Sequence, residues 1–550
     1  MRSSSMFRRG VLFLLLFAAM IMNSSSRQAE GAVYRVKPGG TGDGSSWEKA
    51  LDEQGFLSKL AESGYGDEFW IVAGTYRPAV PQEKTSAGNG SDLRESSFSL
   101  KNGVALYGGF AGNETARDQR NWKKNLTVLS GVIDERNKDN IVKSYHVVTA
   151  IGPRGSIATL DGFIISGGSA DGEDAKGKGG GMHIDGYSVT VQNCIFTGNS
   201  AVEGGGVYAA GGSPVIRDCI FTENTADFGG GLFSEDILLT LEDCTFSGNR
   251  ALKGGGMFNR PAAEEEDEAS ATSAAPDITG CLFLENTAEE EGGGIFNNEI
   301  SPSVKDCTFS WNIAEVGGAM ANMKGGPIVT GSTFSENIAR NGGAMANLES
   351  SPVIINSTFW SNEAEAEGGA LYNDRSSPIV VNVTFTLNSA ERGGGMLNSD
   401  SSPVVANTIL WGNGSEIRLL RGGTTTVTYS IVEGGFDGEG NIDRNPRLAR
   451  LADNGGPTGT CALNSRSPAI DAGLPVGTAV SGNISVPGTD QRGVLRSRHP
   501  GADIGAYEYE DPDTPIRPGG ASSGCSAAPG GTGLFILLLP LLITGIRRKK

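Results

Sequence analysis

The sequence predicts an all-β protein: a single-stranded, right-handed parallel β-helix with a short capping helix at its N-terminal end. Glycine accounts for 82 of the 550 residues, about twice its usual share of roughly 7%. A Phe-x-x-Asn signature returns about every 25 residues through the middle of the chain. Between these signatures stand short β-branched runs separated by Gly, Pro, Asn and Asp, without the length or the 3.6-residue period of a helix.

The Phe-x-x-Asn signature defines the repeat. Its members are Phe196/Asn199, Phe221/Asn224, Phe246/Asn249, Phe283/Asn286, Phe309/Asn312, Phe334/Asn337, Phe359/Asn362, Phe385/Asn388 and the substituted pair Leu410/Asn413. Successive spacings are 25 or 26 residues, except for one of 37 residues that encloses an insert, residues 261–275. If each repeat forms one coil, equivalent side chains stack about 4.8 Å apart. We therefore expect a Phe column in the core and an Asn amide ladder at a turn.

The regions on either side of the signature repeats complete the predicted β-helix. Residues 161–415 are expected to form the repeating coils, and residues 32–160 the N-terminal cap with the first irregular coils. Apolar residues at near-helical spacing from Trp47 to Leu60 predict the capping helix, and Phe69 to Val72 predict a strand after it. A cap is needed because the open end of a repeat protein invites aggregation.

The repeat units resemble a known family. Gly-Gly-Ala/Gly steps, such as Gly317-Gly318-Ala319, combine with the Phe-x-x-Asn signature over about 235 residues. These units are similar to the repeats of polymorphic outer-membrane proteins, within the pectin-lyase-like class of β-helices. The resemblance implies a β-helix carried to the cell surface. The chain departs from that family where a sorting tail takes the place of the C-terminal autotransporter barrel.

Residues 407–509 resemble a second family. The relevant stretches are residues 440–446, 453–458, 467–473, 490–493 (Asp-Gln-Arg-Gly) and 502–508 (Ala-Asp-Ile-Gly-Ala-Tyr-Glu). In this order they look like the choice-of-anchor Q domain, which occurs on exported β-helix proteins with alternative C-terminal anchors. The resemblance implies surface display and says little about chemistry.

The N-terminus predicts export. Arg8 and Arg9 precede an apolar run that ends at Met22, and Gly31 and Ala32 flank a suitable cleavage site. Residues 1–31 are therefore expected to be a signal peptide. The alternative is a permanent anchor, although the run is short for a membrane span.

The C-terminus predicts sorting. Residues 510–533 form a Pro/Gly/Ser-rich linker, and residues 534–550 an apolar segment with a basic end. Gly524 and Cys525 begin a pattern that resembles GlyGly-CTERM sorting signals, especially the Synerg-CTERM form. That resemblance implies processing by a rhomboid-type protease and contact with the membrane only before processing. The alternative is a simple transmembrane anchor.

Five cysteines follow the repeat. Each stands two residues before the signature Phe: Cys194, Cys219, Cys244, Cys281 and Cys307. Residues two apart on a strand share a face, so an interior column is expected. Packing is the favoured role. Disulfides between neighbouring coils and a metal site are the alternatives, although a linear column lacks the tetrahedral convergence that zinc prefers.

The search for a chemical site identifies no catalytic or cofactor-binding residue. His183 and Asp185 stand together on an early coil, where a solvated turn is the favoured interpretation. Asp171, Glu173 and Asp174 are candidate calcium ligands, as are the acidic residues of the stretch 437–443, but neither stretch has the spacing of an EF-hand. Calcium therefore remains the one cofactor considered.

A series of acidic residues stands between the repeat Asn and the Gly-Gly step. Its members are Glu203, Asp227, Glu289 to Glu291, Glu315, Glu363, Glu365, Glu367 and Glu391, interrupted by Lys253 and Arg340. Stacked coils are expected to align them along one edge, where divalent cations would relieve repulsion. The alternative is a solvated edge that blocks lateral aggregation.

These predictions combine into a functional hypothesis. The net charge of −18 argues against a phosphate-binding surface, so nucleic acid is not an expected partner. We expect an exported protein at the cell surface or outer membrane, or released from it, that binds a ligand such as a polysaccharide or protein without catalysis. The alternative is a polysaccharide lyase or glycoside hydrolase, with a groove that gathers carboxylates and Arg or Lys near the early coils and residues 166–186.

Overall fold

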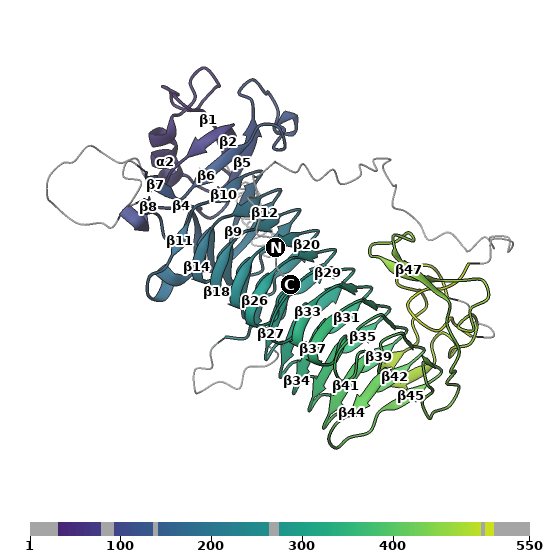
Figure 1. Cartoon of the computed structure of the whole chain (residues 1–550). Helices are drawn as coiled ribbons and strands as arrows, with labels where there is room; N and C mark the ends of the chain where they lie inside the picture. The colour runs from purple at the N-terminus through teal and green to yellow at the C-terminus, as the bar shows by residue number, and fades with distance from the viewer. Residues whose placement is uncertain (1–30, 79–92, 136–140, 263–273, 497–500, 511–550) are drawn as a thin grey trace, which may run out of the picture. The chain divides into compact units, whose positions relative to one another are not determined.

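The computed structural model describes residues 31–78, 93–135, 141–262, 274–496 and 501–510, and the coils stack in chain order (Figure 1). One compact unit ends at Tyr509. A representative coil contains four short strands: β30 (Met320–Met323), β31 (Ile328–Thr330), β32 (Thr333–Ser335) and β33 (Ile338–Asn341). Each pairs in parallel with its equivalent in the next coil. The predicted parallel β-helix is confirmed.

We call the four resulting layers sheets a, b, c and d. In the regular coils sheet a comprises β15 (Val207–Ala210), β19 (Leu232–Glu235), β23 (Met257–Arg260), β27 (Ile295–Asn298), β30, β34 (Met345–Leu348), β38 (Leu371–Asp374), β41 (Met396–Ser399) and β44 (Ile417–Leu419). Sheet b comprises β16 (Val215–Arg217), β20 (Thr240–Glu242), β24 (Asp277–Thr279), β28 (Ser303–Lys305), β31, β35 (Val353–Ile355), β39 (Ile379–Val381), β42 (Val404–Ala406) and β45 (Thr426–Thr428).

Sheets c and d complete each turn of the chain. Sheet c comprises β3 (Gly74–Tyr76), β6 (Thr127–Ser130), β10 (Ile164–Ser166), β13 (Ile195–Thr197), β17 (Ile220–Thr222), β21 (Thr245–Ser247), β25 (Leu282–Leu284), β29 (Thr308–Ser310), β32, β36 (Thr358–Trp360), β40 (Thr384–Thr386), β43 (Ile409–Trp411) and β46 (Ile431–Val432). Sheet d comprises β11 (Ser169–Ala170), β14 (Ser200–Glu203), β18 (Thr225–Phe228), β22 (Arg250–Lys253), β26 (Thr287–Glu291), β33 and β37 (Glu363–Glu367).

The early coils are less regular. The long strands β9 (Val148–Asp161) and β12 (Met182–Gln192) run through both sheet a and sheet b and join them. The other early elements are β1 (Val33–Val36), β2 (Glu68–Val72), β4 (Phe98–Ser99), β5 (Val104–Phe110), β7 (Val132–Asp134), β8 (Val142–Lys143) and the short 3-10 turns Leu93–Glu95, Arg117–Gln119 and Asp174–Gly177.

The capping helix is shorter than the spacing predicts. Helix α2 spans Glu53–Glu62 and buries Phe56 and Leu60. It begins there because the Asp52 side chain caps it by accepting a hydrogen bond from the Gly55 amide. Trp47 lies before the helix and packs on Phe110 instead, with ring centroids 5.6 Å apart. The predicted helical start at Trp47 is therefore wrong.

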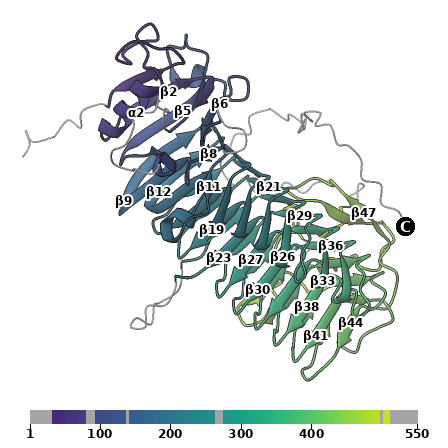
Figure 2. The same ribbon diagram turned by 60° about the vertical axis from the view of Figure 1, so that its left-hand side comes forward.

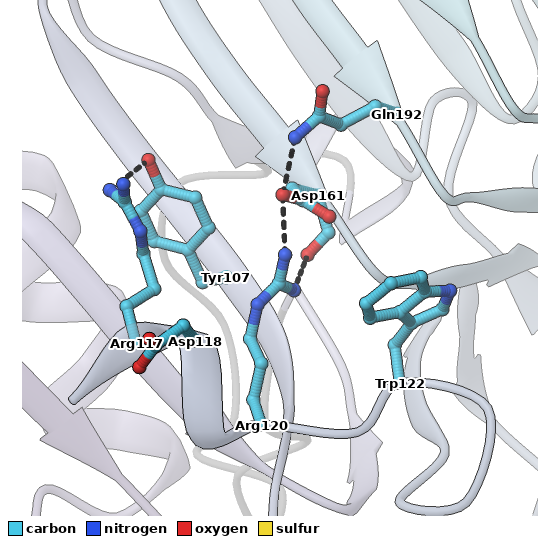
Figure 3. Close-up of a pocket in the computed structure, with 7 residues that line it drawn as sticks. All are labelled: Tyr107, Arg117, Asp118, Arg120, Trp122, Asp161 and Gln192. Atoms are coloured by element: carbon cyan, nitrogen blue, oxygen red, sulfur yellow. Dashed lines mark hydrogen bonds and ion pairs between the residues drawn. The ribbon is translucent and has the colours of Figure 1, made fainter. Parts of the chain in front are cut away.

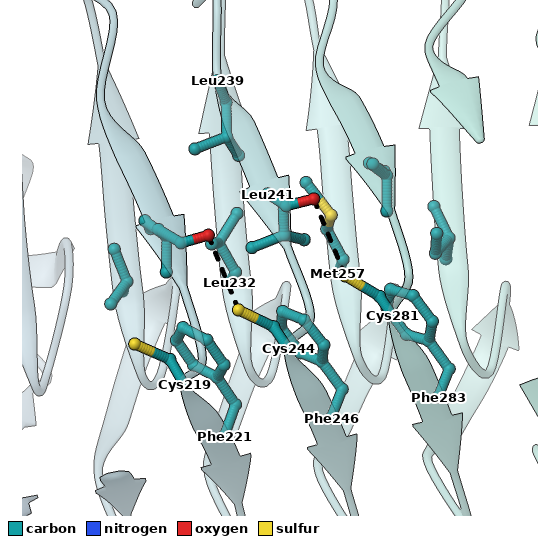
Figure 4. Close-up of a cluster of buried hydrophobic side chains, with 14 of the residues drawn as sticks. Cys219, Phe221, Leu232, Leu239, Leu241, Cys244, Phe246, Met257, Cys281 and Phe283 are labelled. Carbon is teal, nitrogen blue, oxygen red and sulfur yellow. Dashed lines mark hydrogen bonds between the residues drawn. The ribbon is translucent and has the colours of Figure 1, made fainter. Parts of the chain in front are cut away.

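The Phe and Asn columns lie where the repeat predicts. Successive Phe rings from Phe196 to Phe385 stack with centroids 4.5 to 5.0 Å apart (Figure 4). In the Asn column each Nδ2 donates to the Oδ1 of the next Asn at 2.8 to 3.1 Å. These amides are buried, so the ladder satisfies polar groups that would otherwise be costly in the core.

A second Asn ladder was not anticipated. It runs along sheet a through Asn259, Asn297, Asn322, Asn347, Asn373 and Asn398, with Nδ2–Oδ1 distances of 2.8 to 2.9 Å. Its signal is present in the sequence, because each member stands two residues after a Met, Ile or Leu that recurs with the period of the Phe column.

The Gly-Gly corner has a steric origin. Gly317 has φ of 66°, in the region that disfavours side chains. A Cβ on Gly318 would lie 2.3 Å from the Gly343 carbonyl oxygen of the next coil. Neither position accommodates a larger residue without local rearrangement.

The five repeat cysteines are free and buried, as the packing interpretation predicts. Each Sγ donates to the carbonyl two residues earlier, for example Cys307 to Lys305 at 3.2 Å. Burial raises the pKa of Cys219, Cys281 and Cys307 well above its usual value. The thiols of Cys219, Cys281 and Cys307 are therefore protonated in this arrangement, and a protonated thiol is a poor nucleophile.

The residues after the last coils return along the outside of sheet c. We call residues 447–496 and 501–510 the strap; it includes β47 (Leu448–Ala452), β48 (Thr460–Leu463), β49 (Ala479–Ser481) and β50 (Ile484–Ser485). Figures 1 and 2 both show β47 beside the later coils. In the part of the chain that the structure describes, no helix is long and apolar enough to cross a membrane.

The strap contains a buried polar network built from the motif residues near its end. Arg492 pairs with Asp490 at 2.8 Å, and Arg496 pairs with Glu508 at 3.1 Å. All four side chains are at most 6% exposed. Two of the stretches that resemble the choice-of-anchor Q domain, residues 490–493 and 502–508, therefore meet in one network, although they are separate in sequence.

Candidate functional site

A pocket of about 390 Å³ opens at the edge of the early coils (Figure 3). Its lining comes from the ends of β5, β9 and β12 and from the loop that follows β5: Tyr107, Arg117, Asp118, Arg120, Trp122, Asp161 and Gln192. The three strands meet because Tyr107 pairs in register with Asp161, and Asp161 with Gln192. Spacing in the sequence does not predict this site, although two stretches of the chain, residues 106–110 and 118–122, supply most of its lining.

Asp161 is held on every side. It pairs with Arg120 at 2.5 Å, and it accepts hydrogen bonds from Gln192 Nε2 at 2.6 Å and Asn193 Nδ2 at 2.9 Å. Arg120 also donates to the Gly108 and Asp161 carbonyls at 3.0 and 3.1 Å. Both charged side chains are at most 8% exposed. The pair therefore fixes the loop onto the coils, and Asp161 is not poised for proton transfer.

The outer part of the pocket is more accessible. Arg117 donates to the Tyr107 hydroxyl at 2.8 Å and to Glu68 at 3.0 Å, and its side chain remains 49% exposed. Burial raises the pKa of Tyr107, which therefore keeps its phenolic proton. Asp118 is exposed beside it. The pocket thus presents planar donors and acceptors beside two aromatic rings, an arrangement suited to orienting a polar ligand.

A second polar cluster surrounds His183 on the outer side of sheet a. His183 lies between His146 and Tyr208, with ring centroids 5.1 and 5.2 Å away. It is 3% exposed, and its Nδ1 has no partner in the described structure. Burial, with His146 and Lys178 nearby, lowers the pKa of His183 to about 3. His183 is therefore neutral at neutral pH and a weak base.

The predicted partner of His183 lies apart from this cluster. Asp185 is exposed, and among the described contacts no hydrogen bond joins its side chain to His183. The neighbours that His183 does have, Tyr208 and Lys178, come from the next coil and from the preceding turn. His183 and Asp185 therefore do not form a catalytic pair, and the favoured interpretation of a solvated turn is wrong for His183, which is buried on β12.

Two carboxylates of this cluster share one guanidinium. Arg260 Nη2 lies 3.1 Å from Glu203 and 2.8 Å from Glu235, so the two contacting carboxylate oxygens are at most about 6 Å apart. Lys178 lies 3.7 and 3.9 Å from the same two carboxylates, and Tyr208 donates to Glu235. The sequence predicts Glu203 only as part of an acidic edge, and its spacing does not indicate the contacts with Arg260, Lys178 and Glu235's partner Tyr208.

The candidate calcium ligands are not brought together. Asp171 forms an ion pair with Arg94, while Glu173 and Asp174 begin a 3-10 turn. In the stretch 437–443, Asn441 continues the coil hydrogen bonding by accepting from Ser430 at 3.1 Å. No group of three His, Cys, Asp or Glu residues within the described ranges is suited to a metal ion.

The predicted acidic edge is interrupted. In the register of sheet d, the position before Gly-Gly is Glu203, Phe228, Lys253, Glu291, Val316, Asn341, Glu367 and Arg392 in successive coils. Its carboxylates pair with cations, for example Glu291 with Lys253 at 2.8 Å and Glu367 with Arg392 at 2.5 Å. The acidic residues therefore do not share one uniform column.

The predicted processing sites are only partly described. Ala32 lies at the first strand, where its amide donates to Asp67 at 2.8 Å. Cleavage after Gly31 would leave the new ammonium group beside that carboxylate. Gly524, Cys525 and the apolar segment 534–546 lie outside the described residues, so the sorting signal stays a prediction.

Comparisons with known proteins identify the fold. A family model described as "Right handed beta helix region" matches residues 138–262 and 269–432. A search of curated proteins finds no match.

Solved structures similar to this chain include pectate lyase Pel9A, at 12% identity over 88% of this chain and 98% of that one, with a TM-score of 0.38. A mutant tailspike protein of E. coli bacteriophage HK620 has 12% identity, 70% and 72% coverage and a TM-score of 0.28. The GH136 lacto-N-biosidase from Eubacterium ramulus has 9% identity, 76% and 72% coverage and a TM-score of 0.25. Structural similarity at these TM-scores carries no information about the chemistry of this chain.

Proposed function

Because the chain belongs to the right-handed β-helix family, we propose that it is a surface-displayed, non-catalytic binding protein that recognises a carbohydrate ligand. The pocket at Tyr107 carries this proposal. Its buried carboxylate is already saturated by Arg120, Gln192 and Asn193, while Arg117, Asp118 and Trp122 remain at its rim. Such groups hold a polyhydroxylated ring through paired hydrogen bonds without performing acid–base chemistry.

Export and display belong to the same proposal. The signal peptide, the linker and the sorting motif at Gly524 and Cys525 would deliver the chain to the surface and remove both termini. The support is the sequence pattern at each end, together with the position of Ala32 beside Asp67. Intact-mass measurement of protein from fractionated cells tests it: loss of residues 1–31 and of the basic tail is expected, and a retained Lys550 contradicts sorting.

Glycan binding tests the role of the pocket. Full-length mature protein is applied to a panel of immobilised glycans, and Arg117→Ala is compared with Arg340→Ala, another half-exposed arginine that pairs with Glu315 in sheet d. Loss of a charged hydrogen bond should weaken glycan binding about tenfold in Arg117→Ala and leave Arg340→Ala unchanged. Equal affinities in the two variants would exclude the pocket.

The carboxylate pair supports a second candidate function, a glycan-cleaving enzyme. Glu203 and Glu235 form a pair of neighbouring carboxylates, the residue types that a glycosidase mechanism uses, although Arg260 and Lys178 hold both. Incubation with a polysaccharide panel and assay of new reducing ends tests this function. Cleavage that Glu203→Gln and Glu235→Gln each abolish would replace the binding proposal with the enzymatic one.

A further inference from the structure

The strap reveals which kind of partner the outer face of sheet c accepts. Between sheets b and c each coil has one residue of positive φ or a glycine; we call these the turn column: Asn193, Asp218, Asp243, Gly280, Asp306, Gly331, Asn356, Asn382 and Asn407. At Asn356, Asn382 and Asn407 this column binds the strap's main chain. Asn356 donates to the Thr489 carbonyl at 2.8 Å, and Asn407 accepts from the Leu474 amide at 2.7 Å.

Hydroxyl groups at the start of the sheet c strands add a second row of contacts. Thr333 donates to the Gly459 carbonyl at 2.6 Å, and Thr384 accepts from the Ala506 amide at 3.0 Å. Most of these partners are main-chain atoms, and they come from four separate segments of the strap, near residues 458, 474, 489 and 505. The face therefore contacts the strap largely through backbone groups.

The same face continues beyond the strap. The strap's hydrogen bonds to the turn column run from Asn407 back to Gly331, and β32 pairs in register with β29, which begins the preceding coils. We call the outer side of β13, β17, β21, β25 and β29, with the turns that flank it, the open face. Ile220 at its centre is 40% exposed, whereas Thr333 and Thr358, in the same column under the strap, are at most 2% exposed.

The charge changes where the strap ends. Under the strap the turn column carries Asn, whereas on the open face it carries Asp218, Asp243 and Asp306. The opposite edge of the open face, at the turn from sheet c to sheet d, carries Glu223 and Glu285. An ionised carboxylate only accepts hydrogen bonds, so these edges favour N–H donors and cations, with Ile195, Ile220 and Leu282 between them.

We propose that the open face binds a basic segment of a partner polypeptide, on the columns of residues that bind the strap in the later coils. The proposal rests on the binding role inferred above but uses a surface separate from the pocket. Continuity with the strap interface argues for a polypeptide, and the acidic edges argue for lysine or arginine side chains in it. A second copy of this protein is disfavoured because each chain carries a net charge of −18.

Peptide binding to the full-length mature protein tests the proposal. The probe is a fluorescein-labelled decapeptide of alternating lysine and valine, with a glutamate–valine decapeptide as its counterpart, measured by fluorescence anisotropy at low and high salt. The open-face triple variant is Asp218→Asn, Glu223→Gln and Asp243→Asn; asparagine tolerates the positive φ of the two Asp positions. The matched control removes the same charge from exposed positions on sheet d: Glu363→Gln, Glu365→Gln and Glu391→Gln.

We expect the lysine peptide to bind the wild type and the control alike, to bind the open-face triple about tenfold more weakly, and to weaken with salt. Equal loss in both triples, or equal binding of the glutamate peptide, would overturn the assignment. Sedimentation that reveals a dimer lost only in the open-face triple would give the face to a second copy and also overturn it. Glycan binding is measured on the same proteins: if it persists while peptide binding fails, this inference falls and the pocket stands.

Discussion

The coils and the strap are stabilised in opposite ways. In the coils one contact is repeated, because each Phe stacks on the next Phe and each Asn amide bonds the next Asn amide. In the strap every contact is made once: Arg492 with Asp490, Arg496 with Glu508, and Gln491 with Thr333 and Thr358. A substitution in one coil therefore disturbs the coils on both sides of it. A substitution in the strap instead releases only a local segment.

The largest effect is expected in the middle of the first Asn ladder. Asn312 bonds Asn286 on one side, Asn337 on the other, and the Phe283 carbonyl. Asn312→Ala leaves several buried polar groups without partners, at about 1–3 kcal/mol each, so the free energy of unfolding should fall by about 4 kcal/mol. Urea denaturation followed by circular dichroism measures this loss. Asn113→Ala, at an exposed position, should change it by less than about 0.5 kcal/mol.

The strap should respond locally to a change of similar chemical severity. Arg496 is fully buried and bonds Glu508, Asn356 and the Gly505 carbonyl. Arg496→Ala removes one partner of a buried ion pair, at a cost of about 3–5 kcal/mol. Hydrogen exchange should then accelerate in the strap and in the Thr333 and Thr358 strands while the Asn ladder stays protected. Equal acceleration of hydrogen exchange in every coil would contradict the prediction that a defect in the strap stays local. Arg466→Ala, which truncates an exposed side chain of the strap, is the control.

The early coils should add a pH dependence to the free energy of unfolding, because the buried His183 lies there. His183 has a folded pKa of about 3 because it is buried near His146 and Lys178, whereas an unfolded histidine has a pKa near 6.5. The unfolded chain therefore binds more protons between these values, and stability is lost as pH falls through this window. In His183→Gln the loss of unfolding free energy between pH 6 and pH 4 should be smaller by about 1 kcal/mol per pH unit.

Denaturant titrations of both proteins across this range measure that difference. Burial with Glu508 nearby raises the pKa of Asp503 to about 7, which acts in the opposite direction in the same range. It is present in both proteins and cancels in the comparison. Parallel pH profiles for the wild type and His183→Gln would contradict the predicted role of His183.

The smallest effect is expected in the cysteine column. Ser332 and Ser357 already occupy the same column, and Ser332 donates to the Thr330 carbonyl as the cysteines do to theirs. Cys281→Ser should therefore lower the free energy of unfolding by no more than about 1 kcal/mol. A much larger loss, seen only under oxidising conditions, would restore the disulfide alternative.

Periodic features were predictable from the sequence because one contact explains many residues. The Phe column, the first Asn ladder and the interior cysteines followed from spacing alone. The second ladder carried the same signal and was missed. The pocket and the strap network depend on residues such as Arg120 with Asp161, or Arg496 with Asn356, that meet only through the fold. No spacing encodes such single contacts, and so the candidate site emerged only from the structure.

The insert between β23 and β24 has a consequence for protein design. About twelve extra residues enter there, yet Leu241 still pairs with Ile278, and Phe246 with Phe283, in unbroken register. The corner between sheets a and b therefore tolerates foreign sequence without transmitting it to the stack. It is a suitable position to graft an epitope or an affinity tag. The same corner of each neighbouring coil, one inter-strand distance away along the stack, offers a further position.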